Sequence, residues 1–154
     1  MSERVKITKI GSFTGDYAWL SNFWYADIIF EDDMYDSLEK AYVAAKTTDL
    51  VLRNKIRIAK TPGAAKRMGR ELELREGWEG MKLSIMEQLI KEKFTRNLDL
   101  TQRLIDTDGA ELVEGNGWHD NFFGNCSCEK CKSITGENHL GRIIMKVRKG
   151  LLRR

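Results

Sequence analysis

The chain contains little proline, little histidine and no long apolar segment. Of its 154 residues, one is proline, two are histidine and three are cysteine. No uninterrupted apolar run approaches the ~20 residues of a membrane-spanning helix. The start of the chain, Met1-Ser2-Glu3-Arg4-Val5, lacks the apolar core of a signal peptide. These absences predict a cytosolic protein with no membrane partner.

Internal divisions are also missing from the sequence. We find no internal repeat, no low-complexity tract and no linker that would divide the chain. With 42% hydrophobic residues the chain can bury one sizeable core, because single domains cluster near ~100 to 150 residues. The sequence therefore predicts one domain over residues 1–154, and it leaves the oligomeric state open.

Neither sign of charge is in large excess. The chain has 26 basic and 23 acidic residues, a formal net charge of +3. The basic surplus is concentrated at the end, in Arg148, Lys149, Arg153 and Arg154. This surplus suits an anionic ligand but falls far short of the charge of a protein that coats nucleic acid.

The three cysteines, Cys126, Cys128 and Cys131, lie within a few residues of one another. An odd number in one loop argues against a disulfide framework and favours a reducing compartment. Two interpretations remain open: simple loop thiols, or a structural zinc ion whose fourth ligand is His119 or His139. No cofactor is required by either interpretation.

Hydrophobic periodicity and turn signals predict a helix-rich α+β fold with a few short strands. Strands are expected at Val5–Ile10, Ala26–Phe30 and Glu111–Glu114, with a turn at Glu31–Asp33 and a structured loop over Gly15–Tyr25. Helices are expected at Asp36–Ala45, Leu50–Ala59, Gly63–Arg70, Trp78–Phe94, Leu104–Ile105 and Leu140–Leu151.

Three of these helices have a start signal. Asp36 and Glu39 have the spacing of a capping box, and the Asp99–Gln102 spacing repeats it before the short helix. Thr61-Pro62 places the single proline at the first helical position, where its missing N–H costs nothing.

Polar and aromatic residues crowd into two stretches that are far apart in the sequence. One runs from Tyr35 to Lys46 and the other from Trp118 to Asn138, with both histidines in or beside the second. Gly and Asn are interleaved there with Trp and Phe, a mixture that makes a poor core and a good pocket. We interpret the two stretches as a ligand site.

Several ordered motifs carry a resemblance to a known family. They are Leu20-Ser21-Asn22-Phe23, Ser37-Leu38-Glu39-Lys40-Ala41-Tyr42-Val43-Ala44-Ala45-Lys46, Ala65-Lys66-Arg67-Met68-Gly69-Arg70, Leu112-Val113-Glu114, Asp120-Asn121-Phe122-Phe123-Gly124 and Asn138-His139-Leu140-Gly141-Arg142-Ile143-Ile144-Met145-Lys146-Val147-Arg148. In this order they resemble the YbiA-like, or NADAR, family over nearly the whole chain. The resemblance implies a YbiA-like domain that cleaves N-glycosidic bonds.

The resemblance also implies the kind of substrate. Substrates described for the family include phosphorylated ribosylamino-pyrimidine intermediates of riboflavin synthesis, and ADP-ribose attached to guanine in nucleic acid. The expected partner is therefore a phosphorylated ribosyl-base, either a free metabolite or ADP-ribosylated DNA or RNA.

Two carboxylates, Glu39 and Asp120, suit this chemistry. Cleaving a ribosyl C–N bond builds positive charge on the sugar, so a carboxylate is needed to stabilise that charge or to deprotonate water. The family's motifs point to the same two residues, and we expect both to approach the anomeric carbon. Which one activates water stays open. Each has a structural alternative: Glu39 as the partner of Asp36 in a capping box, and Asp120 as an Asx-turn residue.

Aromatic side chains are expected to hold the base. Trp78, Trp118 and Phe123 could stack on a planar heterocycle, although Trp78 opens the long helix and could equally pack in the core. Phe123 stands where the family usually has Trp. The change keeps a ring but removes an indole N–H, which can alter the substrate range.

Basic and neutral polar residues are expected to bind the phosphate and ribose. Lys46, Lys66 and Arg70 could meet phosphates or could be solvated surface charges. Asn138 could cap the last helix or reach the ribose hydroxyls. Ser21 and Asn22 match a family motif and could donate or accept neutral hydrogen bonds; otherwise they are turn residues.

A second kind of function is compatible with the same residues. The chain could be a non-catalytic module that binds ADP-ribose or a nucleotide, with the cysteine loop as a small zinc module. The presence of both Glu39 and Asp120 favours the enzyme, because a binder of anionic ligands gains little from two carboxylates.

Overall fold

The computed structural model describes residues 6–154, so Val5 of the first expected strand lies outside the described residues. The chain divides into two compact units, which we describe separately. The central unit comprises residues 22–101. The terminal unit comprises residues 6–21 and 102–154. Both strands and helices are present, which confirms the α+β prediction.

The central unit opens with a two-stranded antiparallel hairpin. Its strands are β2 (Tyr25–Phe30) and β3 (Asp33–Ser37), joined at Glu31 and Asp32, whose φ angles of 45° and 72° suit a tight hairpin turn. The prediction of β2 is confirmed. The prediction that Asp33 belongs to the turn is wrong, because Asp33 pairs with Phe30 as the first residue of β3.

Helix α1 (Leu38–Ala45) follows β3 directly, and its cap differs from the prediction. The Ser37 hydroxyl, not the Asp36 carboxylate, accepts the capping hydrogen bond, which comes from the Lys40 N–H. Asp36 instead pairs with the buried Lys40 ammonium at 3.0 Å. Glu39 thus occupies the second helical position rather than the third, so the capping-box alternative for Glu39 is wrong.

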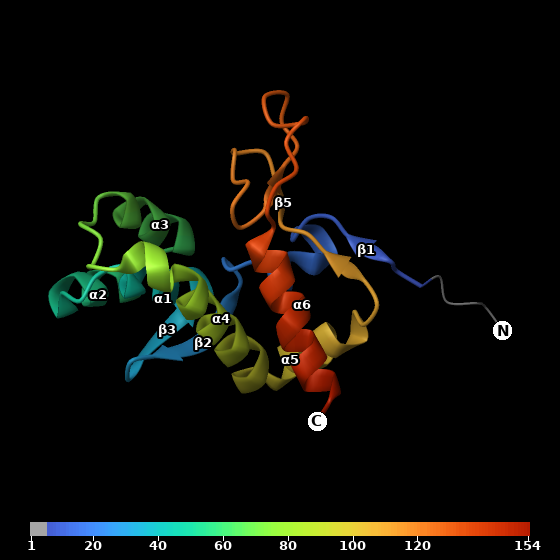
Figure 1. The fold of residues 1–154 in the computed structure, drawn as a ribbon. Coiled ribbons are helices and arrows are strands. Elements are labelled where there is room, and N and C mark those ends of the chain that lie inside the picture. The colour runs from blue at the N-terminus through green and yellow to red at the C-terminus, as the bar shows by residue number, and fades with distance from the viewer. Residues whose placement is uncertain (1–5) are drawn as a thin grey trace. The chain divides into compact units, whose positions relative to one another are not determined.

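Three more helices complete the central unit. They are α2 (Leu50–Arg57), α3 (Pro62–Arg70) and α4 (Trp78–Arg96). Asp49 caps α2, a signal absent from our sequence prediction, and Thr61 caps α3 ahead of the proline as expected. Helix α1 packs against all three and against the hairpin (Figure 1). The fully buried alanines of α1, Ala41, Ala44 and Ala45, allow this close approach.

Helix α5 (Leu98–Asp106) begins in the central unit and ends in the terminal unit. We expected a short helix preceded by a cap at Asp99. That expectation is wrong, because the helix already starts at Leu98 and Asp99 lies in its first turn.

The terminal unit contains two pairs of very short parallel strands. One pair is β1 (Lys9–Ile10) with β4 (Glu111–Leu112), and the other is β5 (Gly115–Asn116) with β6 (Asn125–Cys126). The 3-10 helix η1 (Gly15–Leu20) occupies the stretch expected to be a structured loop. The strand predicted at Glu111–Glu114 is confirmed only over its first half.

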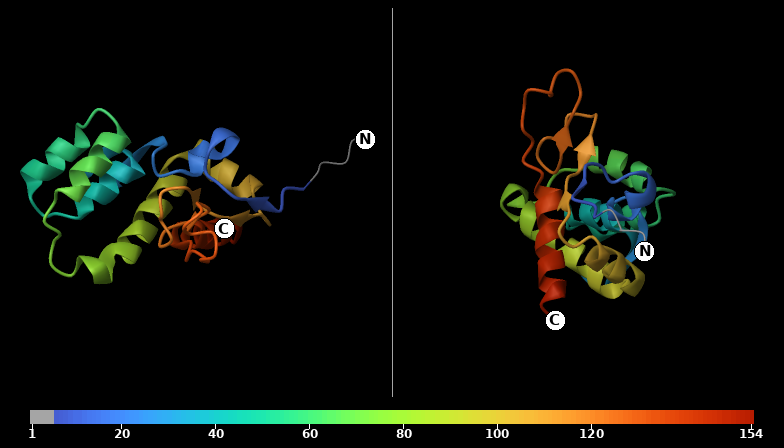
Figure 2. Two further views of the ribbon diagram at one scale, coloured as in Figure 1. Left: turned by 90° about the horizontal axis from the view of Figure 1, so that it is seen from above. Right: turned by 90° about the vertical axis from the view of Figure 1, so that its right-hand side faces the viewer.

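Helix α6 (His139–Leu152) ends the terminal unit, and the segment between β5 and α6 extends beyond its N-terminal end (Figure 2). Gly141 lies against β4 so closely that a Cβ there would be 2.1 Å from the Leu112 carbonyl oxygen. Arg148 is buried and donates to the carbonyl oxygens of Thr107 and Ala110. Arg148 therefore stabilises the fold and is not part of an exposed basic surface at the C-terminal end of the chain.

In the part of the chain that the structure describes, no helix combines the length and the apolar character needed to cross a membrane.

Candidate functional site

Glu39 is held at the start of α1 in the central unit. Its backbone N–H donates to the carbonyl oxygen of Asn22 at 3.0 Å, which ties the entry to the helix to a loop. Its side chain is half-buried, and the positive end of the α1 dipole favours a negative charge in this first turn. Glu39 is therefore a partly shielded carboxylate at a helix N-terminus.

Glu39 and Tyr42 lie on one face of α1, and Lys46, the C-cap residue, continues that face because its backbone is still helical. The Lys46 ammonium is 5.4 Å from the centroid of the Tyr42 ring. Burial lowers the pKa of Lys46, and the negative charge of Glu39 partly offsets that effect. The carboxylate and the ammonium thus act on each other electrostatically.

Two further lysines act on Lys46 electrostatically. The positive charges of Lys66 on α3 and Lys82 on α4 both lower the pKa of Lys46 further. We call Glu39, Lys46, Lys66 and Lys82 the lysine–glutamate cluster. Lys82, which also pairs with Glu79 at 2.6 Å, is absent from the sequence prediction, although it lies one helical turn beyond Trp78. Three lysines whose charges act on one another suit a ligand that brings phosphate charge.

Asn22 is tied to Glu39 by the backbone hydrogen bond described above, and Ser21 directly precedes it in the chain. The Asn22 amide donates to the Met86 sulfur at 3.7 Å, and its Oδ1 is buried without a hydrogen-bond partner among the described residues. A buried oxygen without a partner is unusual in a folded protein. Ser21 ends η1, where its backbone N–H donates to Ala18.

Trp78 is buried, and Arg70 is exposed. Trp78 is only 5% exposed, and its ring lies against the Tyr42 ring with centroids 5.3 Å apart. This geometry supports the packing alternative, and stacking of Trp78 on a base stays a prediction. Arg70 is exposed in the last turn of α3.

Asp120 organises its own loop in the terminal unit. Its Oδ1 accepts from the backbone N–H groups of Phe122 and Phe123, at 3.1 and 2.9 Å. Asn116 holds the same loop from the other side, because its Oδ1 accepts from the N–H groups of Trp118 and Asp120. The Asx-turn alternative for Asp120 is therefore confirmed, and a catalytic role for the carboxylate stays a prediction.

The aromatic residues of this loop are placed differently from one another. Trp118 is 59% exposed. Phe123 is half-buried and meets Phe122 edge-on, with centroids 4.8 Å apart and an interplanar angle of 83°. Phe122 in turn contacts the His139 ring at 4.5 Å. Trp118 is thus the member of the loop with an accessible ring.

Asn138 connects two parts of the terminal unit. It occupies the N-cap position of α6, but its side chain does not cap the helix. Its Oδ1 accepts from the Glu114 N–H and its Nδ2 donates to the Leu112 carbonyl oxygen. The expectation of a side-chain cap is therefore wrong, and both amide atoms are already engaged within the protein.

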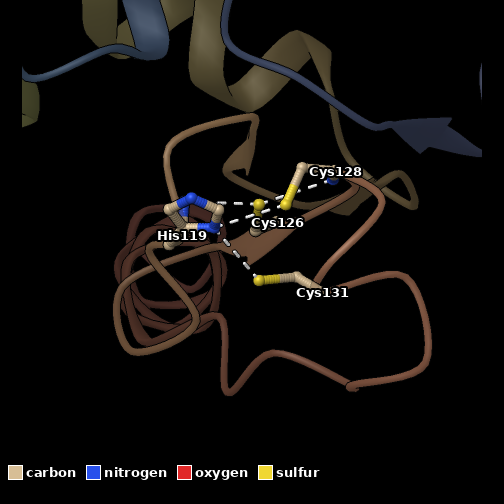
Figure 3. Close-up of side chains that lie close together, drawn as sticks. All are labelled: His119, Cys126, Cys128 and Cys131. Carbon is tan, nitrogen blue, oxygen red and sulfur yellow. Dashed lines mark hydrogen bonds between the residues drawn. The ribbon is translucent and has the colours of Figure 1, made fainter.

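The three cysteines gather around one histidine, His119 (Figure 3). The ligand atoms of His119, Cys126, Cys128 and Cys131 all lie within 4.8 Å of one another, and these residues could hold a metal ion. His139 instead contacts Phe122 and lies 3.6 Å from a Glu137 oxygen. The structure thus selects His119 from the two histidines considered.

The thiols of this group are electrostatically unequal. The N–H groups of Cys128 and His119 donate to the Cys126 sulfur and lower the pKa of that thiol. Burial raises the pKa of the Cys131 thiol. All three cysteines are free of disulfide bonds.

A cavity of about 500 Å³ also lies in the terminal unit, away from these residues. Tyr17, Trp19 and Arg103 are among the residues that line it, and none of the candidate site residues does. We assign it no part in the chemistry.

Comparison with known proteins gives the chain a family. The NADAR domain family model matches residues 11–152. N-glycosidase YbiA of Escherichia coli (strain K12) is 32% identical over 142 residues, which cover 91% of this chain and 85% of YbiA. A riboflavin biosynthesis protein of Vibrio vulnificus (strain YJ016) is 31% identical over 138 residues, which cover 88% of this chain but only 36% of that protein.

The fold gives the same answer. The NMR structure of YbiA from E. coli matches with a TM-score of 0.79 and 30% sequence identity, covering 99% of this chain and 88% of YbiA. Because the family model spans most of the chain and the fold agrees with that of a relative over nearly its whole length, the chain belongs to the NADAR family.

Proposed function

We propose that the protein hydrolyses the N-glycosidic bond between a phosphorylated ribose and a base nitrogen. The reaction class follows from the family, since the relative YbiA is named an N-glycosidase and is 32% identical over most of this chain. The substrate class is the finer part of the proposal and rests on side chains of this chain.

The lysine–glutamate cluster is the observation that carries the substrate class. Burial is the main cause that lowers the pKa of Lys46, and the positive charges of Lys66 and Lys82 lower it further. A bound phosphate would offset that repulsion. The carboxylate of Glu39 belongs to the same cluster, so phosphate binding and a carboxylate for the sugar are supplied together.

Glu39 and Asp120 have the chemistry that the reaction needs. One carboxylate stabilises the positive charge that develops on the ribose, and the other deprotonates the attacking water. The bond between C1 and the base nitrogen breaks, the water oxygen bonds to C1, and a proton reaches the leaving nitrogen. No organic cofactor and no metal ion takes part at the cleaved bond.

Two substrates fit this description, and each has some support. Relatives named for riboflavin biosynthesis support a ribosylamino-pyrimidine phosphate. The exposed ring of Trp118 supports ADP-ribose attached to guanine in a nucleic-acid strand, because exposed aromatic rings stack on bases. The shared chemistry is a phosphorylated ribose bonded to a ring or exocyclic nitrogen.

Mass spectrometry of the products tests the proposal. The protein is incubated separately with an oligonucleotide containing ADP-ribosylated guanosine and with ribosylamino-pyrimidine phosphates, and the released base and sugar phosphate are measured. We expect release from at least one of them. If neither substrate releases a base, the proposal is contradicted.

A non-catalytic nucleotide-binding module is the second candidate, favoured by the cysteine–histidine group next to an exposed Trp118. The same incubation separates the two, because a binding module would retain the ADP-ribosylated ligand chemically unchanged.

A further inference from the structure

Four ligand-type side chains of the terminal unit face one point in space. They are His119, which follows β5, and Cys126, Cys128 and Cys131, which lie in and after β6 (Figure 3). We propose that these four residues bind one zinc ion, and that the ion fixes the loop that carries Asp120. The second half of this inference rests on the proposed function, because it concerns a proposed catalytic residue.

The distances match tetrahedral coordination. Zinc binds sulfur at about 2.3 Å and nitrogen at about 2.0 Å, so neighbouring ligand atoms of a tetrahedron are about 3.5 to 3.8 Å apart. His119 Nδ1 is 3.3 Å from the Cys128 sulfur and 3.4 Å from the Cys131 sulfur. All ligand atoms lie within 4.8 Å of one another, so small side-chain rotations suffice to complete the tetrahedron.

The donor set selects the metal and its role. Three thiols and one imidazole are soft or borderline ligands, which favour zinc and disfavour magnesium and calcium. Four protein ligands fill a tetrahedral zinc site and leave no open position for water or substrate. The ion is therefore structural and does not act on the glycosidic bond.

The proposed ligand residues also receive hydrogen bonds of the kind that support ligands in metal sites. The Cys126 sulfur accepts from the N–H groups of His119 and Cys128, at 3.3 and 3.5 Å. The Asn121 side chain accepts from the Cys126 N–H at 2.9 Å and also hydrogen-bonds the Cys131 thiol. Such hydrogen bonds orient ligands and stabilise thiolates. Asn121 thus links Cys126 and Cys131, two of the proposed zinc ligands.

The chain connects this site directly to Asp120. His119 precedes Asp120 and adopts a φ of 70°, a left-handed conformation that is uncommon for a residue other than glycine. A metal ion bound to the imidazole would stabilise that conformation. It would thereby fix the orientation of the Asp120 side chain, which belongs to the next residue. Asn121, the next residue, forms hydrogen bonds with Cys126 and Cys131. Asp120 is thus enclosed by residues of the metal site on both sides.

Metal content tests the first half of the inference. The full-length protein is purified under reducing conditions, and bound metals are measured by mass spectrometry. We expect about one zinc per chain, lost in Cys128→Ser and Cys131→Ser and retained in Ser127→Ala and Ser133→Ala, which change neighbouring exposed residues. Retention of zinc in His139→Gln and its loss in His119→Gln would confirm the choice of histidine. Substoichiometric metal in the wild type would overturn the proposal.

Cobalt substitution keeps the test decisive if a cysteine variant does not fold. The wild-type protein, freed of zinc and loaded with Co²⁺, is expected to show thiolate-to-metal charge transfer and the intense visible absorption of tetrahedral cobalt. A weak octahedral spectrum, or a protein mass that shows a cysteine–cysteine disulfide after reduction and zinc addition, would contradict the assignment.

Hydrogen exchange tests the link to Asp120 without using activity. The amides of Phe122 and Phe123, which donate to Asp120, are expected to exchange at least tenfold faster after a chelator removes zinc. Unchanged exchange at these amides would refute the link. An inactive wild type that holds one zinc would contradict the proposed function and leave the metal site standing, whereas an active protein without metal would do the reverse.

Discussion

Replacing Asp120 separates its structural role from its proposed chemical role. In Asp120→Ala, the N–H groups of Phe122 and Phe123 lose their acceptor, and both bonds are shorter than 3.2 Å in the wild type. A hydrogen bond to a charged group contributes ~1.5 to 3 kcal/mol, and the half-buried position favours the low end. We expect a loss of about 3 kcal/mol, or roughly 6 to 12 °C in melting temperature.

Asp120→Asn keeps a side-chain oxygen that can accept both bonds. We expect this variant to lose ~1 kcal/mol or less, because a neutral acceptor replaces a charged one, while turnover falls by ~10² to 10⁴. Thermal unfolding and product release are measured on the same preparations, with the exposed Asp99→Asn as the matched control. An Asp120→Ala protein as stable as the wild type would refute the structural role, and full turnover in Asp120→Asn would refute the chemical role.

Two substitutions test packing and charge elsewhere. Gly141→Ala is expected to destabilise the protein by about 2 kcal/mol or more, because its Cβ would lie 2.1 Å from the Leu112 carbonyl oxygen. The control is Gly150→Ala in the same helix, whose Cβ would meet nothing within 4 Å. Equal chemical denaturation midpoints for the two variants would contradict this prediction. Lys46→Met is expected to stabilise the protein near neutral pH, since the folded state lowers the pKa of Lys46 below 10.5 and so disfavours its charged form. That gain should shrink as the pH rises toward 10.5, and urea unfolding that shows a constant or growing gain would refute the burial argument.

Helices with a strong local signal could be predicted from the sequence. The apolar spacing of the segment that begins at Trp78 indicates a long amphipathic helix, and the Thr61-Pro62 pair favours a helix start, so α4 and α3 appear where expected. These signals lie within a few residues of the element they specify, and packing against the rest of the chain does not alter them.

Elements whose signals overlap could not be predicted. The acidic residues of β3 look like a turn followed by a helix cap, and the strand becomes evident only when Tyr35 and Ser37 are known to be buried on one side. Ser37 then serves as both the last strand residue and the cap of α1. Strands of two residues, such as β5 and β6, depend on pairing between distant segments and carry almost no local pattern.

The candidate residues divide in the same way. Chemical type and family motifs identified Glu39, Lys46 and Asp120, but the sequence could not tell which of them also supports the fold. Choosing His119 over His139 required knowledge of which ring reaches the sulfurs. The part played by Lys82 required the packing of α4 beside α1, which no spacing in the sequence specifies.

Turnover of the two carboxamide variants tests the central claim most directly. Release of the base is measured under single-turnover conditions for Glu39→Gln and Asp120→Asn, with Glu73→Gln and Asp99→Asn as exposed controls. The account predicts that both site variants remain folded and slow by ~10² to 10⁴, while both controls cleave at the wild-type rate. Undiminished cleavage by both site variants would contradict the assignment of the reaction to these carboxylates.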